Sequence, residues 1–186
     1  TWRSMAHRIE ISCREGLRDV PGEKLKRRIK HDLGMEVEDA RVVDVYTIDA
    51  TVDPHILSIL RDDAFVDPVV HRGLLDEATP TDADWVVEVG YKPGVTDNVG
   101  RTAKEVVEAM AGRPFGNGEA VYNSKMYLLK GALSEDDVHR IAVDILANVL
   151  INRYSVKDRT QYDREGGMGV FVPRVDIATE PVVERI

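Results

Sequence analysis

The sequence lacks what several common classes of protein require. It has one cysteine, Cys13, in 186 residues, which excludes an internal disulfide framework and leaves no thiolate cluster for zinc. Apolar runs are short, none approaching the roughly 20 residues that span a bilayer. The first residues contain no apolar segment typical of a signal peptide. We therefore expect a cytoplasmic protein that does not contact membranes.

Positive charge is also scarce. The chain has 25 lysines and arginines against 33 aspartates and glutamates, a net charge of −8. This balance repels phosphate backbones and anionic lipids at long range. We therefore expect neither a nucleic acid nor a membrane as partner.

Residue patterns typical of catalysis are missing as well. No histidine pair shows the spacing of a metal site such as H-x-x-x-H, and no Ser-His-Asp or Cys-His set repeats or clusters. Cys13 continues the alternation of Ile9 and Ile11, which predicts a small core residue rather than a nucleophile. The sequence thus predicts no catalytic residue, no metal site and no cofactor within this segment.

An internal repeat with an offset of 78 residues is the clearest positive feature. Six positions keep their residue type at this offset: Glu10/Glu88, Gly16/Gly94, Asp19/Asp97, Gly22/Gly100, Lys26/Lys104 and Gly34/Gly112. Each copy is long enough to contain its own strands and helices, so the repeat predicts a tandem pair of small units rather than a solenoid.

The repeat and the polar, turn-rich segments divide the chain. We expect a tag remnant or the natural start in 1–6, a first unit in 7–73, a linker in 74–84, a second unit in 85–157 and, in 158–186, the start of a linker to a following domain. Met5 would be the natural first residue, and the chain would be part of a longer one.

Hydrophobic periodicity predicts the elements of the first unit. They are a strand at His7–Arg14, a helix at Lys24–Leu33, a hairpin or one bulged strand within Val37–Thr51, a short helix opened by Asp53 and Pro54, and an edge strand at Phe65–Val70. The apolar phase slips around Asp44, which favours the hairpin over the bulged strand.

The second unit repeats the pattern. We expect a strand at Trp85–Tyr91, a helix at Thr102–Ala111, a strand at Val121–Lys130, a long helix capped by Ser134 and Asp137 with an apolar stripe from Val138 to Val149, and a closing strand at Asn152–Val156. Asp163–Gly169 is expected to be a loop.

These elements predict an α+β fold in which each unit is ferredoxin-like, with helices on an antiparallel sheet. The strands Val45–Ala50 and Met126–Lys130 carry apolar residues on both faces. A sheet with helices on one face needs an apolar cover on the other, and the other unit would supply it in a pseudo-two-fold pair. The residues expected to pack between the units are Tyr46, Ile48, Tyr127 and Leu129.

Each predicted first strand is followed by a Gly-x-x-Asp-x-x-Gly turn. Its residues are Gly16, Asp19 and Gly22 in the first unit and Gly94, Asp97 and Gly100 in the second. A Walker A loop is G-x-x-x-x-G-K-[ST]; here the spacing is one residue longer and Arg101 replaces the lysine. A structural turn in which the aspartate caps a helix is favoured over ligand binding, although a helix N-terminus can still bind an anion.

The second unit resembles PurS, the small subunit of phosphoribosylformylglycinamidine synthase. The similarity lies in the strand and turn Val86–Gly100, which contains Lys92-Pro93-Gly94-Val95-Thr96-Asp97, in Leu133–Asp137 and in the stretch Leu146–Ile151. The first unit is a more divergent match, with Arg14 in place of the lysine. The resemblance covers about Arg8 to Lys157.

The resemblance implies two PurS-like units fused into the N-terminal domain of a single-chain synthase. That enzyme uses ATP, Mg and glutamine-derived ammonia to convert formylglycinamide ribonucleotide to the amidine in purine synthesis. Its nucleotide sites and glutaminase cysteine lie in other domains, so the implied role here is assembly. The implied partners are the glutaminase and synthetase domains or subunits of the same enzyme.

A second class of function fits the same sequence pattern. Tandem sensors of the ACT-like kind are also built from paired ferredoxin-like units, and they bind small molecules at the shared interface. An ATP-binding synthetase after Ile186 would favour the assembly domain, whereas a lone or feedback-regulated domain would favour the sensor.

Overall fold

Six strands form one sheet at the centre of the computed structural model, which describes residues 6–173. They are β1 (His7–Cys13), β2 (Asp39–Asp49), β3 (His71–Leu75), β4 (Trp85–Tyr91), β5 (Ala120–Lys130) and β6 (Asn152–Asp158). Their order is β3-β1-β2-β5-β4-β6, and every neighbouring pair is antiparallel. The predicted α+β class is confirmed.

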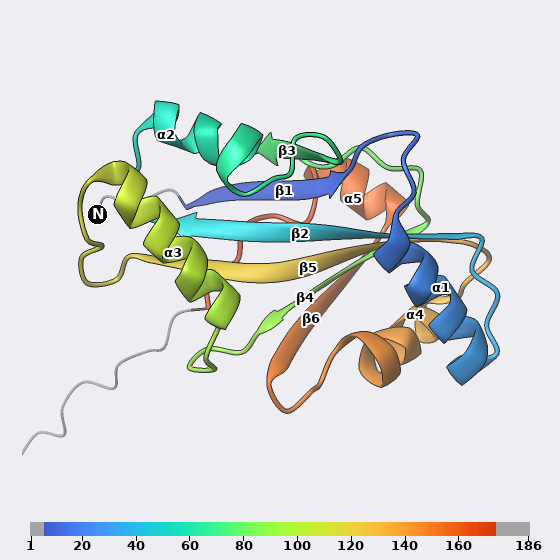
Figure 1. Cartoon of the computed structure of the whole chain (residues 1–186). Helices are drawn as coiled ribbons and strands as arrows, with labels where there is room; N and C mark the ends of the chain where they lie inside the picture. The colour runs from blue at the N-terminus through green and yellow to red at the C-terminus, as the bar shows by residue number, and fades with distance from the viewer. Residues whose placement is uncertain (1–5, 174–186) are drawn as a thin grey trace, which may run out of the picture.

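The helices lie on both faces of this sheet. They are α1 (Val20–Leu33), α2 (Pro54–Ile59), α3 (Asn98–Ala111), α4 (Glu135–Ile141) and α5 (Arg159–Glu165), with the π-helical turns η1 (Leu60–Ala64) and η2 (Ala142–Leu146) after α2 and α4. Figure 1 shows α1 to α4 in front of one face and α5 behind the other. Within residues 6–173, no helix has the length and apolar character needed to cross a membrane.

The two apolar cores on the face that carries α1 to α4 each combine residues from both halves of the chain. In one core, Ile9 and Leu57 of the first half pack with Val107 of α3. In the other, Ile29 of α1 packs with residues of β4, α4 and η2, which belong to the second half. Neither half therefore completes its apolar cores from its own residues.

Equivalent elements of the two halves are separated along the chain by a nearly constant number of residues. β1 and α1 begin 78 residues before β4 and α3, and β2 begins 81 residues before β5. The β2–β5 ladder joins the halves at the middle of the sheet, from Asp39 opposite Lys130 to Asp49 opposite Ala120. Asp44 and Lys125, the central residues of these strands, face each other.

The predicted hairpin within Val37–Thr51 is wrong, because β2 is a single strand. Its ladder with β5 continues without interruption past Asp44, so the strand also has no bulge in this ladder. Both faces of β2 are covered: Val43 and Val45 lie in the core beneath α5, while Ile48 lies in a core on the opposite face. Apolar residues on both faces therefore produced the apparent phase slip.

The predicted edge strand at Phe65–Val70 is also wrong, since β3 begins at His71. Asp67 and Pro68 form a turn in which the Asp67 carboxylate accepts a hydrogen bond from Val69 N at 3.1 Å. Phe65 stacks on Tyr46 with ring centroids 4.5 Å apart. β3 extends to Leu75, two residues into the predicted linker 74–84.

The long helix predicted to reach Val149 is shorter than expected. The capping box of Ser134 and Asp137 starts α4 as predicted, but η2 ends at Leu146 and Ala147 is extended. Asn148 instead stabilises the turn that follows, because its side chain accepts a hydrogen bond from Leu150 N at 3.1 Å. Val149 is consequently exposed.

Asp163–Glu165, predicted as part of a loop, form the last turn of α5. The Asp158 side chain caps this helix by accepting a hydrogen bond from Gln161 N at 2.7 Å. The proposed start at Met5 and residues 174–186 of the predicted domain linker lie outside the described residues.

The sequence led us to expect that the other half covers the second face of the sheet. This expectation is wrong. The halves meet edge to edge through β2 and β5. Instead, Tyr162 of α5, Met168 after it, and Ala78 and Ala83 of the linker cover this face. The linker and the C-terminal segment are therefore part of the packed structure.

Candidate functional site

The two Gly-x-x-Asp-x-x-Gly turns have the same geometry. Asp97 Oδ1 accepts a hydrogen bond from Gly100 N at 2.7 Å, and Oδ2 accepts one from Asn123 N of β5 at 2.7 Å. Asp19 makes the equivalent bonds to Gly22 N and to Val42 N of β2, both at 3.0 Å. Each aspartate therefore caps a helix and fastens it to the following strand.

The glycines of the second turn have separate roles. Gly94 has φ 83°, in the left-handed region that favours glycine. Gly100 lies so close to β5 that an added Cβ would meet the carbonyl oxygen of Val121 at 2.5 Å. Gly16 and Gly22 repeat these features in the first turn. All six turn residues therefore have a structural role.

The four residues predicted to pack between the halves all lie on β2 and β5, the strands that join the halves. Ile48 and Leu129 are completely buried, whereas Tyr46 and Tyr127 are half-buried. Ile48 and Tyr46 belong to one core and Leu129 and Tyr127 to the other. They therefore pack beneath the helices rather than between two stacked sheets.

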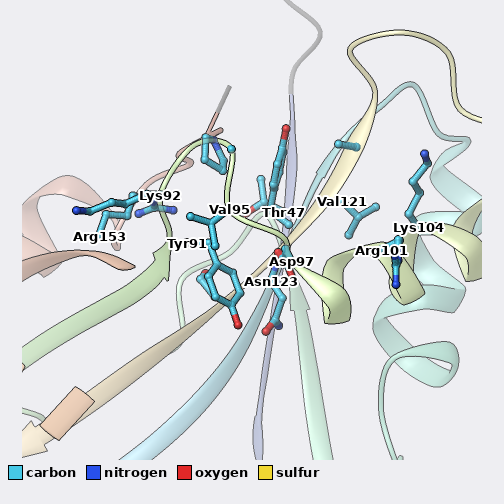
Figure 2. Close-up of a pocket in the computed structure, with 15 residues that line it drawn as sticks. Thr47, Tyr91, Lys92, Val95, Asp97, Arg101, Lys104, Val121, Asn123 and Arg153 are labelled. Atoms are coloured by element: carbon cyan, nitrogen blue, oxygen red, sulfur yellow. The ribbon is translucent and has the colours of Figure 1, made fainter. Parts of the chain in front are cut away.

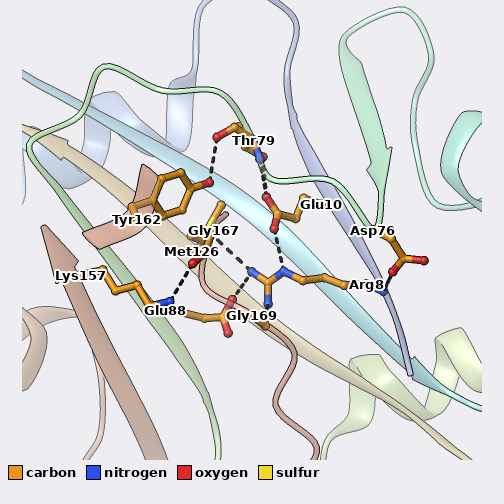
Figure 3. Close-up of polar contacts among 10 residues, drawn as sticks. All are labelled: Arg8, Glu10, Asp76, Thr79, Glu88, Met126, Lys157, Tyr162, Gly167 and Gly169. Carbon is orange, nitrogen blue, oxygen red and sulfur yellow. Dashed lines mark hydrogen bonds and ion pairs between the residues drawn. The ribbon is translucent and has the colours of Figure 1, made fainter. Parts of the chain in front are cut away.

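A buried polar network lies on the other face of the sheet (Figure 3). Arg8 Nε donates to Glu10 Oε2 at 2.7 Å, and its Nη2 bonds Glu88 Oε1. These three side chains are 6%, 2% and 3% exposed. Because β2 and β5 lie between β1 and β4, the Arg8 side chain crosses the junction between the halves.

The network also holds the linker and the C-terminal segment. Glu10 Oε1 accepts bonds from Thr79 N at 2.9 Å and Thr79 Oγ1 at 2.7 Å. Tyr162 OH donates to Thr79 O at 2.8 Å, and Arg8 Nη1 donates to Gly169 O at 3.1 Å. One buried cation thereby connects both halves, the linker and the segment after α5.

Burial and ion pairing shift the pKa of Arg8 in opposite directions. Burial opposes the charged form of Arg8, but the hydrogen bonds and charges of Glu88 and Glu10 outweigh it, so the pKa of Arg8 lies above its usual value. Burial, assisted by Glu10, raises the pKa of Tyr162, so its hydroxyl remains a hydrogen-bond donor.

A cavity of about 220 Å³ lies beside the second turn (Figure 2). The β4–β5 ladder ends at Gly90 opposite Ser124. Beyond Gly90 the chain separates from β5 and forms the turn that leads into α3. The polar and charged residues that line the cavity include Thr47, Lys92, Asp97, Arg101, Lys104, Asn123 and Arg153. Thr47 comes from the first half, so residues of both halves meet there.

An equivalent cavity of about 790 Å³ lies beside the first turn. It is bounded by Asp19, by the start of β2 and by Arg72, which occupies the position of Arg153. Several carboxylates also line this cavity: Glu15, Asp19, Glu38, Asp39 and Asp82. Its cations are Arg41, Arg72 and Lys130, so the described lining keeps a net negative charge, whereas that of the cavity beside the second turn is net positive.

Cys13 lines the first-half cavity as a free, half-buried thiol. Cys13 is the last residue of β1, its Sγ lies 3.6 Å from Arg18 O, and it is less buried than the expected core position. Among residues 6–173, no group of three or more histidine, cysteine, aspartate or glutamate side chains is arranged to hold a metal ion.

The sequence patterns did not predict the buried network or the position of Arg153. Glu10 and Glu88 were visible as an identity of the repeat within otherwise apolar strands, and that combination is a signal for a buried, paired carboxylate. Arg8 has no such signal, because Val86 occupies its position in the second half.

Comparison with known proteins gives no further information about this site. The sequence matches no model of a known protein family and no curated protein.

Proposed function

We propose that this chain is the assembly domain of a phosphoribosylformylglycinamidine synthase, built from two fused PurS-like units of ferredoxin-like topology. The sequence similarity around Val86–Gly100 motivates this proposal. The β2–β5 ladder is the structural observation that supports it, because it joins the two repeated halves through equivalent strands in a register centred on Asp44 and Lys125.

The centre of this ladder supports fusion in particular. Asp44 faces Lys125 at equivalent positions of the two strands, with Lys125 Nζ 2.7 Å from Asp44 Oδ1. In a dimer of identical chains, the same residue would face itself, and like charges directly opposite are destabilising. A fused pair can place opposite charges there.

Exposed apolar side chains offer a surface for assembly. The turn after η2 exposes Val149, Leu150 and Ile151, of which Leu150 is 80% exposed. The equivalent turn of the first half exposes Val69, at 76%, and Val70. We propose that the larger apolar turn, Val149–Ile151, packs against the synthetase or glutaminase.

The assembly role is tested by activity. The isolated chain should hydrolyse neither ATP nor glutamine above blank. In the full enzyme, Leu150→Asp should reduce amidine formation from formylglycinamide ribonucleotide several-fold through weaker assembly, with little change in melting temperature because the side chain is exposed.

Val69→Asp, at the equivalent exposed position, is the matched control and should leave activity unchanged. A reproducible rate of ATP or glutamine hydrolysis by the isolated chain, lost on mutating Asp97 or Arg101, would contradict the assembly role. So would a full-length protein that does not form the amidine at all.

The mixed cores lead to a separate prediction about folding. A protease site inserted after the exposed Pro80 should cut the chain into halves that remain associated, because β2 and β5 pair along their full length. Each half prepared alone should be unfolded, since its apolar cores need residues of the other half. Circular dichroism and size-exclusion chromatography of the separate and mixed halves test this; a cooperatively folded, monomeric half would contradict it.

A tandem small-molecule sensor is the second candidate. It is favoured by the cavity beside Arg153, where Thr47 of the first half joins residues of the second. The sequence of the complete reading frame distinguishes the candidates, because the assembly domain requires a synthetase elsewhere in the enzyme.

A further inference from the structure

The cavity beside the second turn concentrates positive charge in an otherwise acidic chain. Four cationic side chains line it: Lys92, Arg101, Lys104 and Arg153. Asp97 is the only carboxylate among the lining residues that the structure describes, and both of its oxygens accept hydrogen bonds from backbone amides. One carboxylate cannot balance four cations, so the described lining has a net positive charge.

Three of these cations have no ion-pair partner within residues 6–173. Lys104 lies 3.6 Å from Glu108, whereas Lys92, Arg101 and Arg153 make no ion pair in that part of the chain. Figure 2 shows Lys92 and Arg153 at one end of the cavity and Arg101 with Lys104 along α3. Lys92 follows Gly90 by two residues, and Gly90 pairs with Arg153. Such diagonal neighbours are within reach of long side chains.

Arg153 is held in place and partly withdrawn from water. Its guanidinium carbon lies 3.7 Å from the ring centroid of Phe171. A Cβ added at Gly90 would lie 2.8 Å from Arg153 Nη2, so the guanidinium fits there only because residue 90 is glycine. A fixed, planar guanidinium loses little freedom when it binds an anion.

Arg153 also has a buried donor without an acceptor in the part of the chain that the structure describes. Its Nε has no hydrogen-bond partner within residues 6–173. Burial lowers the pKa of Arg153, and Arg8 adds to this effect, while Glu88 opposes it. A buried donor without an acceptor is costly, and within residues 6–173 the Arg153 side chain makes no hydrogen bond that an anion would have to displace.

We propose that this cavity binds a small phosphate-bearing anion, with Arg153 and Lys92 as its principal ligands. A guanidinium donates paired hydrogen bonds to phosphate or carboxylate oxygens, but three unpaired cations favour the dianion. The volume of about 220 Å³ admits a small organic group as well as the phosphate. This inference does not depend on the proposed assembly role.

Titration of the 186-residue chain with inorganic phosphate tests the proposal. At constant ionic strength, we expect saturable NMR shifts of the amides of residues 90–92, 94–97, 121–124 and 153. Arg153→Gln should weaken binding about tenfold or more, the loss expected for a charge-assisted hydrogen bond. Lys92→Gln should weaken it in the same direction, and Lys92 is exposed, so this variant keeps the fold.

Arg72→Gln is the matched control, because Arg72 has the equivalent place in the acidic cavity of the first half. This variant should bind phosphate like the parent chain. Acetate, a monoanion, should bind at least several-fold more weakly than phosphate. Absence of saturable phosphate shifts, equal losses from Arg72→Gln and Arg153→Gln, or acetate binding as tight as phosphate would overturn the proposal.

Discussion

Replacing Arg8 by methionine should lower the free energy of unfolding by about 3–5 kcal/mol, the range for removing one partner from a buried ion pair. The variant leaves Glu10 and Glu88 buried without their cation. It also removes the hydrogen bond to Gly169 O and the connection across β2 and β5. Chemical denaturation of the full chain, with linear extrapolation, measures the change.

Two further variants identify the cause of this loss. Arg41→Met removes an exposed arginine that pairs with Asp39 at 3.3 Å, and exposed pairs contribute only about 0–1 kcal/mol. Combining Arg8→Met with Glu10→Gln and Glu88→Gln should recover part of the stability, because the buried carboxylate charges are gone. If Arg8→Met lowered the free energy of unfolding no more than Arg41→Met does, the buried network would contribute nothing to holding the halves together.

The sequence predicted the local elements well where turn chemistry and periodicity agree. Asp19 and Asp97 cap α1 and α3, and Asp53 and Ser134 start α2 and α4 as expected. These features depend on residues a few positions apart, so they can be read from a single sequence.

The errors arose where distant segments decide the structure. β2 has apolar residues on both faces because the linker and α5 cover the second face, and no local pattern reveals that cover. The same applies to Arg153, whose environment depends on Gly90 and Phe171. The cavity and the network are therefore tertiary features, which the periodicity of one chain cannot show.

Asp97→Ala should destabilise the chain by about 2–3 kcal/mol, because Asp97 has two structural functions. Loss of the cap of α3 costs about 0.5–2 kcal/mol, and Asn123 N loses its acceptor on β5, a cost of about 1–3 kcal/mol when the group is buried. Because Asn123 is only partly buried, we expect the total cost to lie below the sum of the two upper limits. Asp97→Asn should cost less, because the amide keeps one acceptor oxygen for one of the two backbone groups.

Asp53→Ala isolates the contribution of the cap. Asp53 accepts a hydrogen bond from His55 N at 2.7 Å at the start of α2, and no hydrogen bond joins its side chain to a strand within residues 6–173. This control should cost about 1 kcal/mol. Hydrogen exchange of the Asn123 amide should accelerate in Asp97→Ala and remain unchanged in Asp53→Ala. Equal losses of stability in the two variants, with an unchanged Asn123 exchange rate, would show that the bond from the turn to β5 contributes nothing and that Asp97 acts as a cap alone.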